Sequence, residues 1–344
     1  MRNEVYIEII NKGIQRLLLF QDKRKGALTE GCFFYPYWRN KRETYVNSRW
    51  QEAVFSLSWY FNKFNNEDVW ESAIKGIDFW CKLQQTNGAF PEYSRRDRSY
   101  SATAFSTLAI INSLKLMNYS KDKWLEKIGK SCNYLMKNID YVFIRNEMAA
   151  SLALLKAGEY LHEPKYLQES ERKLNEILKK QTSKGYFLEK NSFDLGHNSL
   201  ILELLGNYYL STKDKKILDS ASKFINLFLN IDINNYKKFK KANWIIINGF
   251  EIFSNEVRNG KEALIKALNN FNFHQLEYDN NLCTDLYKLC YAYDNVREDL
   301  EHVELKTDLN PNENFYYSFR PSKILNILRP FGIHKFLKIK YKYL

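Results

Sequence analysis

The sequence has little glycine and proline. Its 344 residues include 13 Gly and 6 Pro, and no stretch rich in Gly, Ser or Pro divides it. Because linkers between domains are commonly rich in these residues, we expect one large domain rather than two small ones. Hydrophobic residues make up 45% of the chain, which is enough for a sizeable core.

Cysteine pairs and long apolar runs are also lacking. The five cysteines are odd in number and widely spaced, and none forms a C-x-x-C pair. We therefore predict reduced, buried thiols, with neither a metal site nor a cofactor. The N-terminus lacks the apolar run of a signal peptide, and no apolar run approaches membrane-spanning length. These absences predict a cytoplasmic protein.

Aromatic residues and basic charge, by contrast, are abundant. Aromatic residues make up 16% of the chain, and the formal net charge is +12. Aromatic faces stack on sugars, prenyl groups or nucleobases, so they favour no single ligand. The charge reflects either solvated lysines or an anionic partner, such as a uronic-acid glycan, a lipid pyrophosphate, a membrane surface or a nucleic acid. The Walker A, G-x-G-x-x-G, H-E-x-x-H and G-x-S-x-G motifs are absent.

Apolar residues recur with helical spacing along most of the chain. The pattern predicts twelve helices, over residues 3–21, 47–64, 69–85, 101–117, 121–138, 145–160, 164–181, 197–212, 214–229, 243–255, 260–271 and 281–294. Short linkers alternate with long ones. In a ring of helical hairpins, this alternation puts every long loop at the same end of the barrel, where binding and catalysis usually lie.

The predicted helices fall into two kinds. Those that follow long loops are rich in small residues, as in 101–109 and 148–153, which permits close packing in an inner ring. The helices between them carry one apolar stripe and a Lys/Glu face, as expected of an outer ring. We predict an all-α (α/α)6 toroid over residues 1–294. A basic C-terminal extension, 295–344, either packs on the barrel or contacts a membrane surface near a lipid-linked glycan.

Two segments repeat each other. Residues 83–92 and 178–189 each contain a Gln, a turn at Gly, an aromatic residue and then a Glu. We expect the Gly to end an outer helix in a left-handed conformation and the aromatic residue to pack between helices.

These elements resemble a known superfamily. The Gln…Asn-Gly-x-Phe element, the Tyr-Ser-Ala-Thr-Ala-Phe run that begins at Tyr100, and the segment 185–205 are similar to those of six-hairpin glycosidases, toroid polysaccharide lyases and uronyl epimerases of polysaccharide loci. The resemblance covers residues 49–294. It implies a toroid fold and a carbohydrate-active enzyme whose partner is an oligo- or polysaccharide, and it leaves the reaction open.

Candidate residues for chemistry gather where long loops enter inner helices. Hydrolysis of a glycoside needs two carboxyl groups, and the junctions offer Glu92, Glu147, Asp194 and Asp285. Helix capping is the alternative role for Asp194 and Glu147. Elimination or epimerisation needs a base beside a uronate carboxylate and a cation to neutralise it. His197 with Tyr93 or Tyr100 could move the protons, and Arg49, Arg96 or Arg145 could neutralise the carboxylate. A structural role is the alternative for His197.

The predicted catalytic residues are Glu92, Glu147, Asp194, His197 and Asp285, and the predicted substrate-binding residues are Arg49, Trp50, Tyr93, Arg96, Tyr100, Arg145, Asn198 and Trp244. Hydrolysis of an anionic, uronic-acid-containing saccharide is the leading prediction, because carboxylates outnumber histidines at the junctions. A lyase or epimerase is the second, and a non-catalytic glycan- or isoprenoid-binding protein the third. Nucleic acid is not an expected partner.

Overall fold

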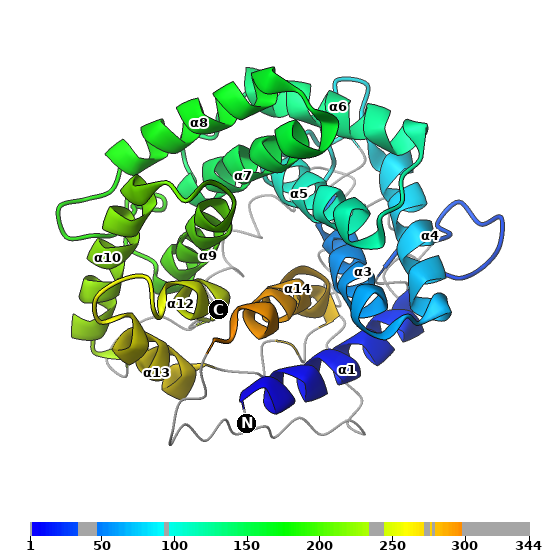
Figure 1. The fold of residues 1–344 in the computed structure, drawn as a ribbon. Helices are drawn as coiled ribbons and strands as arrows, with labels where there is room; N and C mark the ends of the chain where they lie inside the picture. The colour runs from blue at the N-terminus through cyan, green and yellow to red at the C-terminus, as the bar shows by residue number, and fades with distance from the viewer. Residues whose placement is uncertain are drawn as a thin grey trace, which may run out of the picture.

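Two concentric rings of helices form the structure, a computed structural model that describes residues 2–33, 47–92, 96–233, 244–271, 276 and 279–297 (Figure 1). The inner ring contains α3 (Ala53–Phe64), α5 (Tyr100–Met117), α7 (Ile144–Leu161), α9 (Leu195–Thr212), α12 (Asn248–Phe253) and α14 (Asp279–Asn295). The outer ring contains α1 (Arg2–Phe20), α4 (Glu67–Leu83), α6 (Asp122–Lys137), α8 (Pro164–Lys179), α10 (Lys215–Asn230) and α13 (Gly260–Asn270). A 3-10 helix, η1 (Ser48–Glu52), leads into α3.

The inner ring is closed. Each inner helix packs on the next, and α14 contacts both α12 and α3, so the last described helix lies beside the first helix of the inner ring. The (α/α)6 toroid predicted from the sequence is therefore confirmed, and most helices begin and end within a few residues of the predicted positions. The clearest difference is α12, which is shorter than the predicted 243–255. Most of the predicted extension, from residue 298 on, lies outside the described residues.

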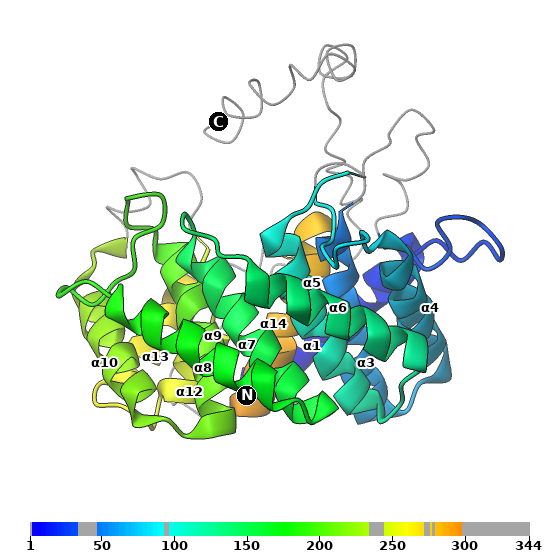
Figure 2. The same ribbon diagram turned by 90° about the horizontal axis from the view of Figure 1, so that it is seen from above.

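The two ends of the barrel differ in their connections. Asn65, Asn118, His162 and Lys213 follow the inner helices α3, α5, α7 and α9 in a left-handed conformation, which reverses the chain within a few residues. The described parts of the long loops lie at the opposite end, at the top of Figure 2. The N-termini of the inner helices, with their positive dipole ends, therefore point toward the long-loop end.

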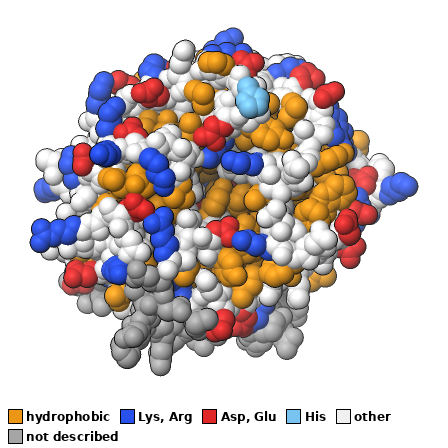
Figure 3. All heavy atoms as spheres, in the orientation of Figure 1, with side chains coloured by type: hydrophobic (Ala, Val, Ile, Leu, Met, Phe, Trp, Pro, Cys, Tyr) orange, Lys and Arg blue, Asp and Glu red, His pale blue; other side chains and the backbone are white. Residues whose placement is uncertain are grey.

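Figure 3 looks onto the end with the short connections. Basic and acidic side chains are mixed over this face, and hydrophobic side chains lie near its centre. Of the described helices, none is both long and apolar enough to cross a membrane. All five cysteines are buried thiols that belong to no disulfide of the described structure, as predicted.

A clamp that occurs three times joins outer helices to their neighbours. At the end of α4, the Gln84 amide donates to the carbonyl groups of Gly88 (3.3 Å) and of Lys127 in α6 (2.7 Å). Gly88 has φ 90°, and a Cβ there would lie 2.2 Å from the carbonyl oxygen of Lys130. The other copies are Gln181, which donates to Gly185 and to Ser220 of α10, and Gln21, which donates to Gly31 and to Ser72 of α4.

Each clamp is followed by a buried phenylalanine two residues after the glycine: Phe33, Phe90 or Phe187. The left-handed glycines and packed aromatic residues predicted for two copies are thus confirmed. The glycines lie in the turn after the helix rather than at its last residue, because a glutamine side chain holds the turn from the helix end. The copy at Gln21 was not predicted.

Replacing Gly88 by Ala tests the close approach between a clamp loop and the next helix. The new Cβ would clash with a backbone carbonyl and would also occupy a positive φ, so we expect Gly88→Ala to lower the free energy of unfolding by about 3 kcal/mol. Gly26→Ala is the matched control, since Gly26 has φ 76° but nothing within 4 Å of its Cβ position. It should cost about 1 kcal/mol. Urea unfolding measures both, and equal losses would show that the clash is relieved.

Candidate active site at the long-loop end

His197 and Asp194 lie together at the start of α9. Asp194 caps the helix, because its Oδ1 accepts the backbone N–H of His197 at 2.9 Å. The same oxygen lies 3.5 Å from Nδ1 of the His197 imidazole, which is 27% exposed. The imidazole packs edge-on against Trp244, with ring centroids 5.4 Å apart. Asp194 thus caps the helix, as the alternative reading predicted, and also faces the imidazole.

Gly196 allows this arrangement. A Cβ at residue 196 would lie 2.8 Å from the indole of Trp244, so only glycine lets that indole approach α9 and reach His197. Trp244 comes from the segment before α12, and the imidazole is therefore positioned by two neighbouring hairpins of the ring.

Arg145, at the start of α7, lies near enough to Asp194 for the charge of Asp194 to raise its pKa. Its backbone N–H donates to Glu189 Oε1 at 2.9 Å, and its guanidinium pairs with Glu189 Oε2. Glu189 therefore caps α7 from the following long loop. Burial raises the pKa of Glu189, although Arg145 opposes that rise and Asp194 adds to it. Burial lowers the pKa of Arg145, and the charge of Arg49 lowers it further.

Arg49 connects the rim of this end with its interior. Its guanidinium lies over the ring of Phe105, 4.1 Å from the centroid, and pairs with Glu52 at 2.7 Å. Burial disfavours the charge of Arg49, but Glu52 and, after it, Glu92 outweigh the burial and raise its pKa. Glu92 itself accepts the hydroxyl of Ser99, the cap of α5, at 2.6 Å.

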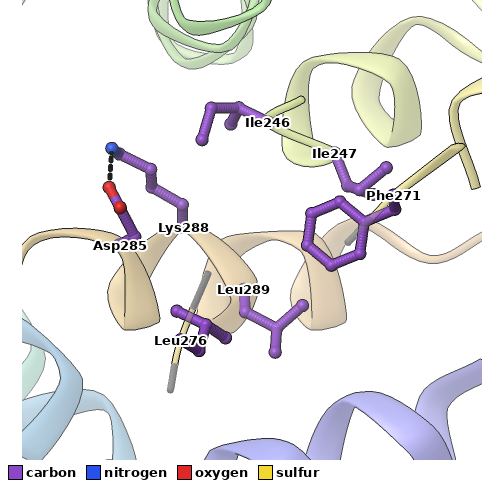
Figure 4. A pocket seen from close by; sticks show the side chains of 7 residues that line it. All are labelled: Ile246, Ile247, Phe271, Leu276, Asp285, Lys288 and Leu289. Carbon is purple, nitrogen blue, oxygen red and sulfur yellow. Dashed lines mark hydrogen bonds and ion pairs between the residues drawn. The ribbon is translucent and has the colours of Figure 1, made fainter. Parts of the chain in front are cut away.

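Deeper in the barrel lies a group of charged side chains that we call the floor cluster: Glu52, Glu203, Asp285, Tyr287 and Lys288. Lys288 Nζ donates to Asp285 Oδ1 at 2.5 Å (Figure 4). Glu203 is 1% exposed, and its Oε2 has no hydrogen-bond partner among the described residues. Burial raises the pKa of Glu203 to about 7, because the opposing charge of Lys288 does not offset it and Asp285 and Glu52 add to it.

A small cavity of about 20 Å³ opens beside the floor cluster. Figure 4 shows Asp285 and Lys288 of α14 on one side of it. Its other walls are apolar, from Ile246, Ile247, Phe271, Leu276 and Leu289. A larger groove, of about 550 Å³, lies elsewhere, between the outer helices α8 and α10, and none of the predicted site residues lines it.

Glu147 and Tyr100 lie apart from these groups. Glu147 Oε2 pairs with Lys173 of the outer helix α8 at 3.0 Å, and Lys173 also donates to the Tyr100 hydroxyl at 3.2 Å. Glu147 Oε1 accepts the backbone N–H of Asp140 at 2.5 Å. These contacts join the inner ring to the outer ring and hold the linker before α7. The predicted catalytic role of Glu147 stays a prediction.

The remaining predicted residues have different surroundings. Asn198 is buried and clamps the backbone of Phe187, accepting its N–H at 2.7 Å and donating to its carbonyl at 3.0 Å. Trp50 is part of the hydrophobic core, and Arg96 is exposed. Tyr93 lies outside the described residues. The structure thus brings together Asp194, His197, Arg145 and Trp244, with Arg49 and Glu92 beside them and Asp285 in the floor cluster.

Sequence reasoning missed two charged residues of this end, Glu203 and Lys288. It placed Glu52 and Glu189 at the junctions but not among the predicted catalytic or substrate-binding residues. Glu203 had a usable signal, since it interrupts the apolar run 200–205 of an inner helix, and a fully buried Glu is rare. Carboxylates outnumber basic groups among the described residues of the site. The segments 34–46 and 234–243, outside the described residues, carry three and four Lys or Arg in their sequences.

Solved structures of known proteins define the class. The chain is similar to an inactive variant of the GH76A α-1,6-mannanase of Salegentibacter sp. HEL1_6, with TM-score 0.58 and 8% identity over 83% of this chain and 98% of that one. It is also similar to a glycosyl hydrolase family 88 protein of Bacteroides vulgatus, with TM-score 0.56 and 12% identity over 85% and 99%. At such identities the likeness concerns the fold alone, and it places the chain among the six-hairpin toroids.

The family follows from a match of sequence. Residues 27–235 match the ulvan lyase N-terminal domain, and the chain belongs to this family. A solved polysaccharide lyase also matches, with TM-score 0.49 and 14% identity over 64% of this chain. The chain spans 35% of the length of that lyase.

The raised pKa of Glu203 predicts a pH-dependent stability. The pKa of a Glu in the unfolded chain is near 4.3, below the value of about 7 in the folded protein, so folding favours the neutral form of Glu203. The stability that this preference contributes is lost as the pH rises through about 7. Glu203→Gln stays neutral. The stability of this variant relative to the wild type should therefore increase between about pH 5 and about pH 8, by up to about 3 kcal/mol.

Chemical denaturation at several pH values measures the effect. Glu126→Gln is the control, since Glu126 is fully exposed on α6 and the hydrogen bond from Lys130 lowers its pKa. Its relative stability should not increase with pH. A flat difference for Glu203→Gln would mean that Glu203 is ionised in the folded protein throughout.

Proposed function

We propose that the protein is a carbohydrate-active enzyme that cleaves an anionic, uronate-containing polysaccharide by β-elimination. The observation that carries the proposal is the His197–Asp194 pair at the long-loop end, with the Arg145 guanidinium beside it. Membership of the ulvan lyase N-terminal domain family supports it. The sequence alone favoured hydrolysis over elimination, and the His197–Asp194 pair reverses that preference.

In this reaction His197 is the base. A proton on Nδ1, facing Asp194, leaves Nε2 as the basic nitrogen, and Nε2 takes the proton from the carbon next to the uronate carboxylate. Arg145, with Arg49 near it, stabilises the negative charge that develops on that carboxylate. The C–O bond one carbon further then breaks. The products are a sugar with a new carbon–carbon double bond and a leaving chain whose oxygen takes up a proton.

The charges of this end fit a polyanion. The inner helices direct the positive ends of their dipoles toward it. The sequences of 34–46 and 234–243, which lie outside the described residues, are rich in Lys and Arg, and basic charge raises the local concentration of an anionic chain. The predicted contact of the extension 295–344 with a membrane surface, and the cytoplasmic location, stay predictions.

Hydrolysis is the second candidate, and the floor cluster favours it. A glycosidase needs one protonated and one ionised carboxyl group. The pKa of Glu203 is raised to about 7 by burial, whereas Asp285 is ion-paired with Lys288. Two carboxyl groups in such different surroundings, one buried without a cation bound to it and one ion-paired, are typical of acid/base pairs. Against it, Glu203 is almost inaccessible.

One experiment separates these candidates. The protein is incubated with ulvan, with other uronate polysaccharides and with an α-1,6-mannan, and both new reducing ends and the ultraviolet absorbance of an unsaturated uronate are followed. Elimination gives both signals on a uronate polymer. Reducing ends without the absorbance would support hydrolysis, and neither signal on any polymer would exclude both cleavage reactions on these substrates and leave epimerisation or glycan binding.

Removing the imidazole should abolish most of the activity. We expect His197→Ala to lower kcat by about 100-fold or more, the usual contribution of a general base, with little change in melting temperature because the side chain is partly exposed. His162→Asn is the matched control. His162 ends α7 at the short-loop end in a left-handed conformation that Asn adopts readily, so activity should be retained. Equal activity of His197→Ala and wild type would remove His197 from the mechanism.

Asp194→Asn separates the two roles of Asp194. Asparagine caps a helix as well as aspartate does, so the melting temperature should change little. The negative charge beside His197 is lost, and we expect kcat to fall by about tenfold or more. Thermal unfolding and initial rates measure the two effects. Loss of stability with unchanged kcat would leave Asp194 with the capping role alone.

A further inference from the structure

Four hydrophobic side chains are exposed together at the long-loop end. Tyr141 and Val142, in the linker between α6 and α7, are 80% and 51% exposed, and Ile139 in the same linker is 42% exposed. Leu188, in the loop between α8 and α9, is 42% exposed. Single exposed apolar residues are common, but a group of them marks a binding surface more often. We call Tyr141, Val142 and Leu188 the rim platform.

The rim platform does not owe its exposure to a loose linker. Asp140 Oδ1 accepts the backbone N–H groups of Val142 (2.8 Å) and Phe143 (3.0 Å), and its Oδ2 accepts from the Asn146 amide at 2.8 Å. The N–H of Asp140 donates to Glu147, which is held by its buried pair with Lys173. Both flanks of Tyr141 are thus fixed from the start of α7.

The two loops of the platform are also joined to each other. Phe143 and Glu189 form an antiparallel bridge, and the N–H of Lys190 donates to the carbonyl of Val142 at 3.4 Å. Leu188, next to Glu189, is therefore brought to the residues beside Tyr141. An aromatic ring held on a rigid scaffold loses little conformational entropy when a ligand covers it, which favours binding.

The platform adjoins the candidate active site. Phe143 carries the Arg145 guanidinium on its ring, 4.2 Å from the centroid, and Lys190 Nζ lies 5.0 Å from the same centroid. Arg145 pairs with Glu189, which is close enough to Asp194 for that charge to affect its pKa. A sugar chain that enters toward His197 past Arg145 would thus pass apolar surface flanked by two cations.

We propose that the rim platform is a sugar-binding subsite, in which Tyr141 stacks on the face of a pyranose ring and Lys190 binds a carboxylate or sulfate group of the same chain. The proposal rests on the proposed function, since it takes the anionic polysaccharide as the ligand. The C–H face of a pyranose is apolar and matches an aromatic ring, whereas the cations match the acidic substituents. The platform then sets how long a chain the enzyme prefers.

Tyr141→Ala tests the stacking. An aromatic contact of this kind contributes a few-fold to about tenfold in affinity, so KM for a long chain should rise by about fivefold, with kcat less affected. The loss of kcat/KM should be larger for long chains than for the shortest substrate that is cleaved. Tyr141→Trp keeps a stacking face and should restore most of the affinity. Lys190→Gln should weaken binding and reduce its dependence on salt.

Leu28→Ala is the matched control. Leu28 is 86% exposed in another loop, the one that follows α1, so its loss removes exposed apolar surface without touching the platform. Its KM should equal that of the wild type. Equal changes in Tyr141→Ala and Leu28→Ala, or a Tyr141→Trp variant no better than Tyr141→Ala, would overturn the proposal.

Binding can be measured without turnover, which keeps this test separate from that of the reaction. Affinity electrophoresis through gels that contain ulvan should show less retardation of Tyr141→Ala than of wild type, even if neither sample cleaves the polymer. Unchanged retardation would contradict the subsite. A change in oligomeric state of Tyr141→Ala, with unchanged retardation, would identify the platform as a protein contact instead.

Discussion

Closure of the inner ring is the constraint on which the site depends. Inner and outer helices alternate along the chain, so the six inner helices run in the same direction and begin at the same end of the barrel. The packing of α14 between α12 and α3 closes them into a ring. The groups that begin a helix are polar by necessity, since the first N–H groups need acceptors. Asp194, Ser99 and Glu189 supply such acceptors. Ring closure therefore brings capping residues from distant parts of the sequence to the same end of the barrel. A capping residue that contacts another side chain, besides the backbone N–H that it caps, is a candidate for a catalytic role.

The same geometry explains why charge is buried here. Side chains one or two turns below the helix starts point into a narrowing barrel, where the loss of water disfavours ionised groups. Burial is the main cause that raises the pKa of Glu203. Lys288 opposes the rise, and the negative charges of Asp285 and Glu52 add to it. A buried carboxyl group without a partner lowers the stability of the fold, and an apolar residue of similar volume would be more stable there. Its presence indicates that this end is built for more than stability.

Most of the fold could be predicted from the sequence, because helix period and loop length are local properties. The alternation of short and long linkers fixed the polarity of the barrel, and the cysteines behaved as expected. The third clamp was hidden, since Gln21 and Gly31 are ten residues apart, whereas Gln84 and Gly88, or Gln181 and Gly185, are four apart. A clamp is defined by the carbonyl groups that the glutamine amide contacts, and loops of different length can bring the glycine to the same position. The partners of Glu147 and Glu203 could not be predicted for the same reason. Lys173 and Lys288 come from other helices, and no local sequence pattern links them to these carboxylates.

The order of the two candidate reactions depends on access as much as on residue type. Carboxylates outnumber imidazoles at the long-loop end, and that count alone favours hydrolysis. Accessibility changes the comparison. Glu203 is 1% exposed, and Glu147 is tied to the outer ring by Lys173, whereas the His197 imidazole is 27% exposed. A group that transfers a proton to or from a polymer must reach it, so the imidazole outweighs Glu203 and Glu147. Asp194 and Asp285 are 26% and 22% exposed, but Asp194 faces the imidazole and Asp285 is paired with Lys288. Two other buried carboxylates act through their charge: Glu52 holds Arg49 and Glu189 holds Arg145.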